Sequence, residues 1–124
     1  MNKYLKISAI VGALSVGIGA FGAHGLKPFL DANQLETFKT GIFYQFIHVI
    51  VMFSIALNIK SYQNMARSFY LFLVGIIFFS GSLYILSTKH LYGGTIWNFV
   101  GPITPIGGIF FIAGWLNLLF VKKI

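Results

Sequence analysis

The residues best suited to chemistry lie on one face of an apolar stretch in the first half of the chain. At about 3.6 residues per turn, a helix places six polar or small residues within an arc of about 100°: Gln34, Thr37, Gly41, Tyr44, Gln45 and His48. The next positions on that face, Met52 and Ile55, are apolar. Because polar groups are costly in hydrocarbon, the stripe must face protein or a wet cavity.

His48 is the deepest member of this stripe, and two interpretations of it stay open. In the first, the ring is neutral and structural, with hydrogen bonds to Tyr44, Gln45 or a serine of another helix. In the second, it lines an outward-open pocket that binds a ligand or a proton. The residues predicted for such a pocket are Tyr44, Gln45, His48, Thr104 and Pro105.

Other catalytic and metal-binding patterns are missing from the sequence. Its three histidines, His24, His48 and His90, form no His-x-x-x-His pair, and it has no cysteine. No Gly-x-Ser-x-Gly motif is present, and the two acids, Asp31 and Glu36, lie in or beside a predicted loop. We therefore predict no catalytic residue, no metal, no cofactor and no enzyme activity. An enzyme with His48 or His24 as a base, acting on a lipid or quinone-like substrate, is the least supported hypothesis.

Small residues follow one face of the first apolar stretch at alternating four- and three-residue steps: Ser8, Gly12, Ser15, Gly19 and Gly22. Small side chains let another helix approach closely, which matters in lipid because apolar surfaces gain little there by burial alone. In a later stretch, Ser80 and Ser82 flank Gly81, and their hydroxyls can bond to their own helix or to another one. Helix packing is the predicted role of both sets.

The last apolar stretch opens with Pro102 and Pro105 among three glycines. Each proline removes a backbone donor and pushes the preceding residue toward extended geometry. The fourth helix is therefore predicted to be kinked or to start late at Pro102/Pro105. A break at membrane depth must be covered by protein or line a cavity, so it would complete a pocket if it faced His48.

The composition indicates that lipid surrounds these helices. Of 124 residues, 57% are hydrophobic and 9% are charged, against about 25% charged in a soluble domain. Four stretches suit a crossing of about 30 Å of hydrocarbon: residues 4–21, 40–57, 68–86 and 99–121. We predict one transmembrane domain over residues 1–124, an all-α, integral membrane four-helix bundle in contact with membrane lipids. The net charge of +7 is scattered between the stretches, so nucleic acid is not an expected partner.

Lysine and arginine predict the orientation. Six of them lie on the side of the two termini and of the second loop, while Lys27, Lys39 and Lys89 lie on the opposite side with both acids. The positive-inside rule then places both termini in the cytoplasm. The first span also has features of a signal peptide, with two lysines before an apolar run, but its row of small residues favours a retained span.

Four motifs occur in order along the chain: Gly-Ala-Phe-Gly-Ala-His-Gly-Leu at 19–26, Thr40-Gly41 with Tyr44-Gln45 and His48, Phe-Ser-Gly-Ser-Leu-Tyr at 79–84, and Thr-Pro-Ile-Gly-Gly at 104–108 with Ala-Gly-Trp at 113–115. With these motifs the chain resembles the YgdD/YwdK-like family of small membrane proteins, catalogued as domain of unknown function 423. The resemblance covers essentially the whole chain. It implies four helices in the bacterial cell (inner) membrane, with a related animal protein in mitochondria, and it carries no assigned reaction, substrate or cofactor.

Two functions are expected above the others. The first is a non-enzymatic accessory or scaffold protein that packs with itself, as a homo-oligomer, or with another membrane protein. The alternative is a small-molecule or lipid binder, or a transporter component, with an outward-facing cavity around His48.

Overall fold

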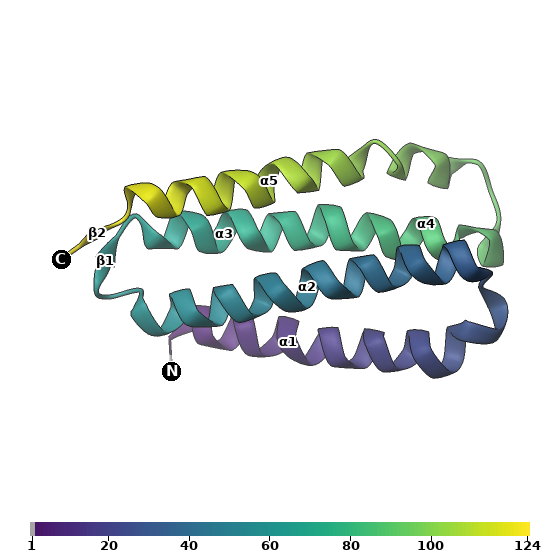
Figure 1. The fold of residues 1–124 in the computed structure, drawn as a ribbon, viewed down its shortest axis with the longest axis horizontal. Coiled ribbons are helices and arrows are strands. Elements are labelled where there is room, and N and C mark those ends of the chain that lie inside the picture. The colour runs from purple at the N-terminus through teal and green to yellow at the C-terminus, as the bar shows by residue number, and fades with distance from the viewer. Residues whose placement is uncertain (1) are drawn as a thin grey trace.

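The structure is a computed structural model that describes residues 2–124. The protein forms four long helical spans that run up and down side by side (Figure 1). The spans cover Lys3–Phe29, Ala32–Asn58, Met65–Tyr92 and Ile96–Phe120. Each is long and apolar enough to cross a membrane, which confirms the predicted all-α, four-span fold. Both termini lie at one end, called here the terminal end; the opposite end is the loop end (Figure 1). A cytoplasmic location of the terminal end stays a prediction.

The first span starts as helix α1 (Lys3–Phe21). It continues through a π-helical turn, η1 (Gly22–Leu26), and a 3-10 turn, η2 (Lys27–Phe29). Asn2 caps the start of α1, because its side chain accepts a hydrogen bond from the backbone N–H of Leu5 at 2.8 Å. The span is therefore helical well beyond its apolar core, up to the loop end.

The second span is one unbroken helix, α2 (Ala32–Asn58). It begins at a capping box in which the Asp31 carboxylate accepts from the Gln34 backbone N–H at 2.8 Å, and the Gln34 side chain accepts from the Asp31 backbone N–H at 2.9 Å. This reciprocal pair satisfies two backbone donors at the helix start. The sequence predicts this start, because Asp31 with Gln34 three residues later has the pattern of a capping box. The helix thus begins well before the apolar stretch at residue 40.

The third span has three parts: helix α3 (Met65–Gly75), a π-helical turn, η3 (Ile76–Ser80), and helix α4 (Gly81–Tyr92). It ends at Gly93, whose φ of 68° lies in the left-handed region that favours glycine. The three parts form one continuous rod in the ribbon (Figure 1).

The fourth span changes geometry beside its first proline. A 3-10 helix, η4 (Ile96–Val100), leads into a turn, and helix α5 (Ile103–Asn117) follows with Pro102 at its N-cap. Pro105 falls in the first turn of α5, where the backbone N–H groups lack intrahelical partners in any case. A short 3-10 turn, η5 (Leu118–Phe120), ends the span.

A short ribbon closes the terminal end. Strand β1 (Tyr62–Gln63) pairs antiparallel with strand β2 (Lys122–Lys123), and the Ile124 N–H donates to the Ser61 carbonyl at 2.8 Å. The ribbon ties the tail after the fourth span to the loop between the second and third spans.

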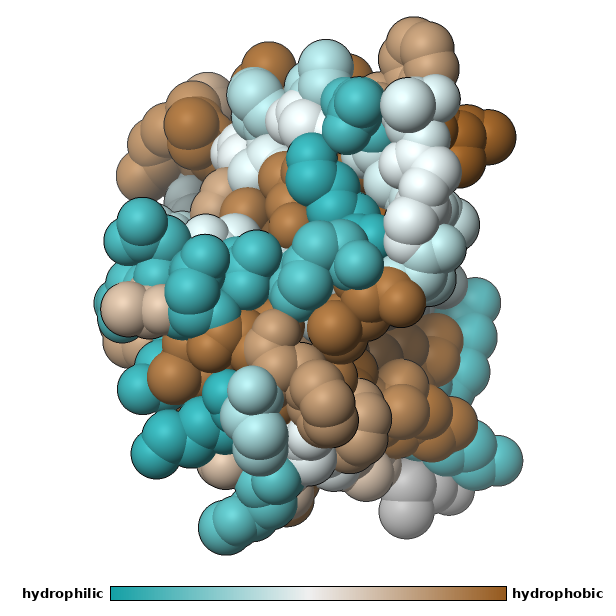
Figure 2. Space-filling view, turned by 90° about the vertical axis from the view of Figure 1, so that its right-hand side faces the viewer, coloured by the Kyte–Doolittle hydropathy of each residue, from teal (hydrophilic) through white to brown (hydrophobic). Residues whose placement is uncertain are grey.

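In the view of Figure 1 the spans follow one another in the order α1, α2, third span and α5, and the main contacts join neighbours in this order. The buried core lies between the middle spans and α5 and comprises Val49, Met52, Ile55, Ala56, Phe69, Phe72, Ile76 and Phe111. From α1, the Tyr4 ring meets Phe69 edge to face at 4.9 Å. Figure 2 looks onto the loop end, where hydrophilic side chains form a band among hydrophobic ones.

Candidate functional site

His48 lies in the interior of the bundle and uses both ring nitrogens. Its side chain on α2 is 4% exposed. Nδ1 lies 2.7 Å from the Tyr44 carbonyl oxygen, and the Trp115 indole N–H donates to Nε2 at 3.1 Å. Because an indole nitrogen only donates, Nε2 must accept and the ring proton must sit on Nδ1. The ring is therefore neutral in this arrangement and links the second span to the fourth.

Aromatic rings surround this imidazole. The Phe111 ring of α5 stacks on it at 3.8 Å between centroids and 8° between planes, and Phe72 lies 5.3 Å away. Outside the pair is a groove of about 300 Å³ lined by Tyr44, His48, Phe79, Gly108, Phe111, Ile112 and Trp115. Because Ile112 and Trp115 are exposed, the groove opens on the lipid-facing side.

Gln45 connects three spans. Its side chain is 3% exposed; Nε2 donates to the Val11 carbonyl of α1 at 3.3 Å, and Oε1 accepts from the Tyr84 hydroxyl of α4 at 2.5 Å. Beside it, the Ser80 hydroxyl donates to the Gly41 carbonyl at 2.8 Å. A Cβ at Gly41 would lie 2.7 Å from the Tyr84 ring, so this glycine permits the close approach of the two spans.

The third and fourth spans are joined by hydroxyls at two heights. Near the loop end, Thr104 and Ser82 share a hydrogen bond of 2.5 Å, and Ser82 donates on to the Phe79 carbonyl at 2.8 Å. Near the terminal end, Ser68 donates to the Gly114 carbonyl at 2.9 Å. These contacts hold α5 against the third span along most of its length.

The small-residue row of the first span faces α2. Ser8 and Ser15 are buried and donate to carbonyls of their own helix, those of Tyr4 and Val11. Added Cβ atoms at the glycines of this row would all meet α2 side chains: at 3.4 Å for Gly12, 3.7 Å for Gly19 and 2.2 Å for Gly22. The row thus lies in the α1–α2 contact.

The five residues predicted to form a pocket are not brought together. Tyr44 and His48 share the groove beside α5, whereas Gln45 points between α1 and α4. Thr104 is held by Ser82, and Pro105 is exposed. Within residues 2–124, every fully buried side-chain nitrogen or oxygen has a hydrogen-bond partner. The same residues contain no group of three or more His, Cys, Asp or Glu side chains that could hold a metal ion.

The partners of this polar stripe, above all Trp115, Phe111 and Tyr84, are not among the residues predicted from the sequence. A signal for the first two was present. Gly107, Phe111 and Gly114 follow one another at four- and three-residue steps, which places them on one face of α5. An indole N–H within an apolar span also needs an acceptor from another helix or from its own backbone.

Comparison with known proteins agrees with the four-span architecture. Residues 18–108 match the model of a protein family of unknown function, DUF423. The chain belongs to the DUF423 family.

Similar proteins cover nearly the whole chain. A UPF0382 membrane protein of Haemophilus influenzae is 41% identical over 120 residues, which is 96% of this chain and 92% of that protein. The UPF0382 membrane protein YwdK of Bacillus subtilis is 34% identical over 122 residues, covering 96% and 94%. The UPF0382 inner membrane protein YgdD of Escherichia coli is 38% identical over 119 residues, covering 93% and 85%. No solved structure matches. This DUF423 chain is thus a multi-pass protein of the bacterial cell membrane.

Proposed function

We propose that this protein is a non-enzymatic accessory or scaffold protein that packs, through the outward face of α1, with a second copy of itself or with another membrane protein. One observation carries the proposal: a second row of small residues on α1 faces away from the bundle. Its members are all exposed: Ala9, Ala13, Gly17 and Ala20.

The outward row has the geometry of a helix-packing surface. Its residues recur at four- and three-residue steps, so they share one face of α1. A Cβ at Gly17 would meet nothing within 4 Å, so contacts within residues 2–124 do not require a glycine there. Glycine in a helix is less stable than alanine by about 1 kcal/mol. Contact with a helix of another protein molecule would explain the glycine, because small residues four apart let two helices approach closely in lipid.

The inward row on the same helix supports this inference. Gly12 and Gly19 are separated by the same four- and three-residue steps and contact Val49 and Ile42 of α2. One face of α1 therefore already uses small residues to receive a helix. The outward row repeats the pattern toward lipid.

The polar groups inside the bundle fit a structural role as well. His48 Nε2 accepts from Trp115 of α5, and the Gln45 amide links α2 to α1 and to α4. A catalytic base or a ligand contact needs a free donor or acceptor. Here these atoms hold the spans in register.

The test is to extract the protein, with its surrounding lipid, directly from the membrane into nanodiscs and to weigh the complexes by native mass spectrometry. The wild type should form a complex of fixed stoichiometry, with itself or with one other membrane protein. Gly17→Leu should dissociate it. Gly81→Leu on the third span, which also has no neighbour within 4 Å of its Cβ position, is the matched control and should leave it intact. A monomeric wild type, or an intact complex in Gly17→Leu, would refute the proposal.

A second candidate, a binder of a small apolar molecule, has one observation in its favour: the groove of about 300 Å³ beside His48. Gly108→Leu would place a side chain in this groove, since a Cβ there meets only the Phe79 ring, at 3.9 Å. A small molecule that accompanies the wild type and is lost from this variant would favour the candidate. The same bound masses on both proteins, or no bound mass on the wild type, would exclude it.

A further inference from the structure

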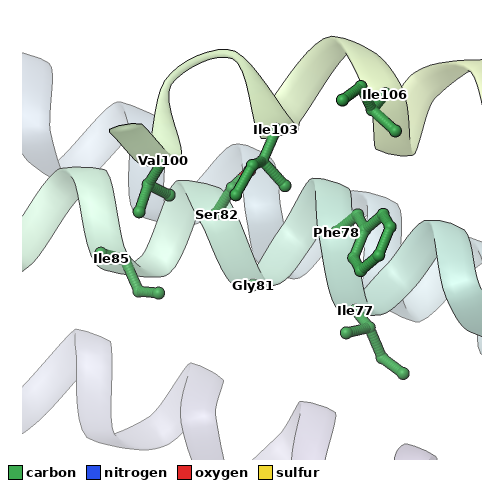
Figure 3. Close-up of a pocket in the computed structure, with 8 residues that line it drawn as sticks. All are labelled: Ile77, Phe78, Gly81, Ser82, Ile85, Val100, Ile103 and Ile106. Atoms are coloured by element: carbon green, nitrogen blue, oxygen red, sulfur yellow. The ribbon is translucent and has the colours of Figure 1, made fainter. Parts of the chain in front are cut away.

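A separate apolar groove of about 250 Å³ lies between the third and fourth spans (Figure 3). Phe78 and Ile85 form its wall on the third span, and Val100 and Ile103 reach toward it from the fourth (Figure 3). Gly81 is its floor, and a Cβ there would meet nothing within 4 Å. The glycine therefore leaves space that the protein itself does not fill.

The surface of this groove is almost entirely carbon. Its one polar side chain, Ser82, is 3% exposed, and its hydroxyl is engaged by Thr104 and by the Phe79 carbonyl. The groove lies within two spans that cross the bilayer. A hydrocarbon chain is therefore the occupant that the lining suits, because a polar molecule would find no free partner there.

Polar groups stand at the mouth of the groove. Lys89 follows Ile85 by one helical turn, and its Nζ donates to the Asn98 side-chain oxygen at 3.1 Å, across from α4 to η4. An ammonium group has three donors, so this contact leaves others for an anion. Tyr92 and Trp97 pack edge to face at 5.1 Å in the same connection. Such rings favour the headgroup layer, which places the mouth at the depth of lipid phosphates.

The length of the groove fits one leaflet. From Lys89 to Ile77, at the deep end of the lining, the third span advances about 18 Å at 1.5 Å per residue. Half of the hydrocarbon core is about 15 Å thick. A chain that starts at the mouth thus ends near the middle of the bilayer.

We propose that this groove binds one acyl chain of an anionic phospholipid, whose phosphate is held by Lys89 and Asn98. Every residue that lines the groove belongs to the third or the fourth span, and none belongs to α1. The site is thus independent of the association proposed for the outward face of α1.

The test is native mass spectrometry of the full-length protein in mild detergent, titrated with phosphatidylglycerol or with phosphatidylcholine of the same chain length. The wild type should bind one molecule of phosphatidylglycerol about fivefold more tightly than phosphatidylcholine, the factor expected for one lysine near the phosphate. Lys89→Gln should abolish that preference. Gly81→Leu, which fills the floor, should weaken both lipids about tenfold or more. Gly17→Leu is the matched control and should bind both lipids as the wild type does.

Equal binding of the two lipids by the wild type, or unchanged phosphatidylglycerol binding in Lys89→Gln, would overturn the proposal. If Gly81→Leu did not fold, Lys89→Gln would still test the proposal. The Lys89 side chain is only half-buried at the protein surface, so its replacement should not prevent folding. The two glycine variants also separate this proposal from the previous one. Gly81→Leu and Lys89→Gln change lipid binding and leave the association intact, whereas Gly17→Leu changes the association and leaves lipid binding intact.

Discussion

Replacing Gly107 with alanine should destabilise the protein more than any other single methyl group added to the fourth span. The α-carbon of Gly107 faces the backbone of the third span. A Cβ there would lie 2.3 Å from the backbone nitrogen of Phe79 and 2.7 Å from its Cα. Backbone atoms inside a helix cannot rotate away as a side chain can, so α5 as a whole has to move.

The cost can be worked out from these distances. To restore an ordinary contact, α5 must move away from the third span by about 1 Å, and such overpacking costs about 1–3 kcal/mol. The shift also stretches the Ser82–Thr104 and Ser68–Gly114 hydrogen bonds, each of which is worth about 0.6 kcal/mol between membrane helices. Together these costs are about 1–4 kcal/mol, so at about 4 °C per kcal/mol Tm should fall by roughly 5–15 °C.

The assay is thermal unfolding in mild detergent followed by tryptophan fluorescence. The chain has two tryptophans, and one of them, Trp115, lies in the contact between α5 and α2. Gly108→Ala is the matched control, because its Cβ would meet only the Phe79 ring, at an ordinary 3.9 Å. It should not lower Tm. If Gly107→Ala were as stable as Gly108→Ala, the close approach of the two backbones would be wrong.

Three further predictions concern hydrogen bonds. Asp31→Ala removes the cap of α2 and should cost about 1 kcal/mol in the free energy of unfolding, measured by titration with denaturing detergent, while Asp31→Asn should keep most of it. Trp115→Phe leaves Nε2 of His48 without its donor; it should cost about 1–2 kcal/mol and shift the ¹⁵N resonance of that nitrogen, whereas an unchanged resonance would contradict the contact. Gln45→Leu should cost about 1–2 kcal/mol in the free energy of unfolding. Tyr84→Phe should cost less in the Gln45→Leu background than in the wild type, because the Tyr84 hydroxyl has already lost its acceptor there.

The number of spans and the packing faces of the first two helices could be predicted from the sequence, because they depend on residues close together in the chain. The capping box at Asp31 and Gln34 and the polar stripe down to His48 are both local patterns, and both features are present in the structure. The ends of the spans were less accurate. Hydropathy detects only the part that lies in hydrocarbon, whereas the helices continue to caps and turns in the headgroup layers.

Patterns within one helix could indicate which face of α5 packs inward, but not which of its residues meet the polar stripe, because that depends on the height at which separate helices meet. The predicted pocket required the region around Thr104 and Pro105 to face His48, which the sequence left open. In the structure α5 meets this ring further along, at Phe111 and Trp115. That register follows from the close approach of Gly107 to Phe79, which no pattern within one helix reveals.

The π-helical turn η3 determines where the third span can lose a residue without turning its buried face away from its neighbours. The buried face of the span continues through this turn, since Phe69, Phe72, Ile76 and Ser80 are all buried. The turn absorbs one extra residue, as such single-turn bulges do. Removal of one residue from 76–79 should therefore restore a plain α-helix with both halves still facing their neighbours. The same deletion inside α3 or α4 would turn part of the span by about 100° relative to the rest. A one-residue gap between related chains is thus far less disruptive at this turn than anywhere else in the third span.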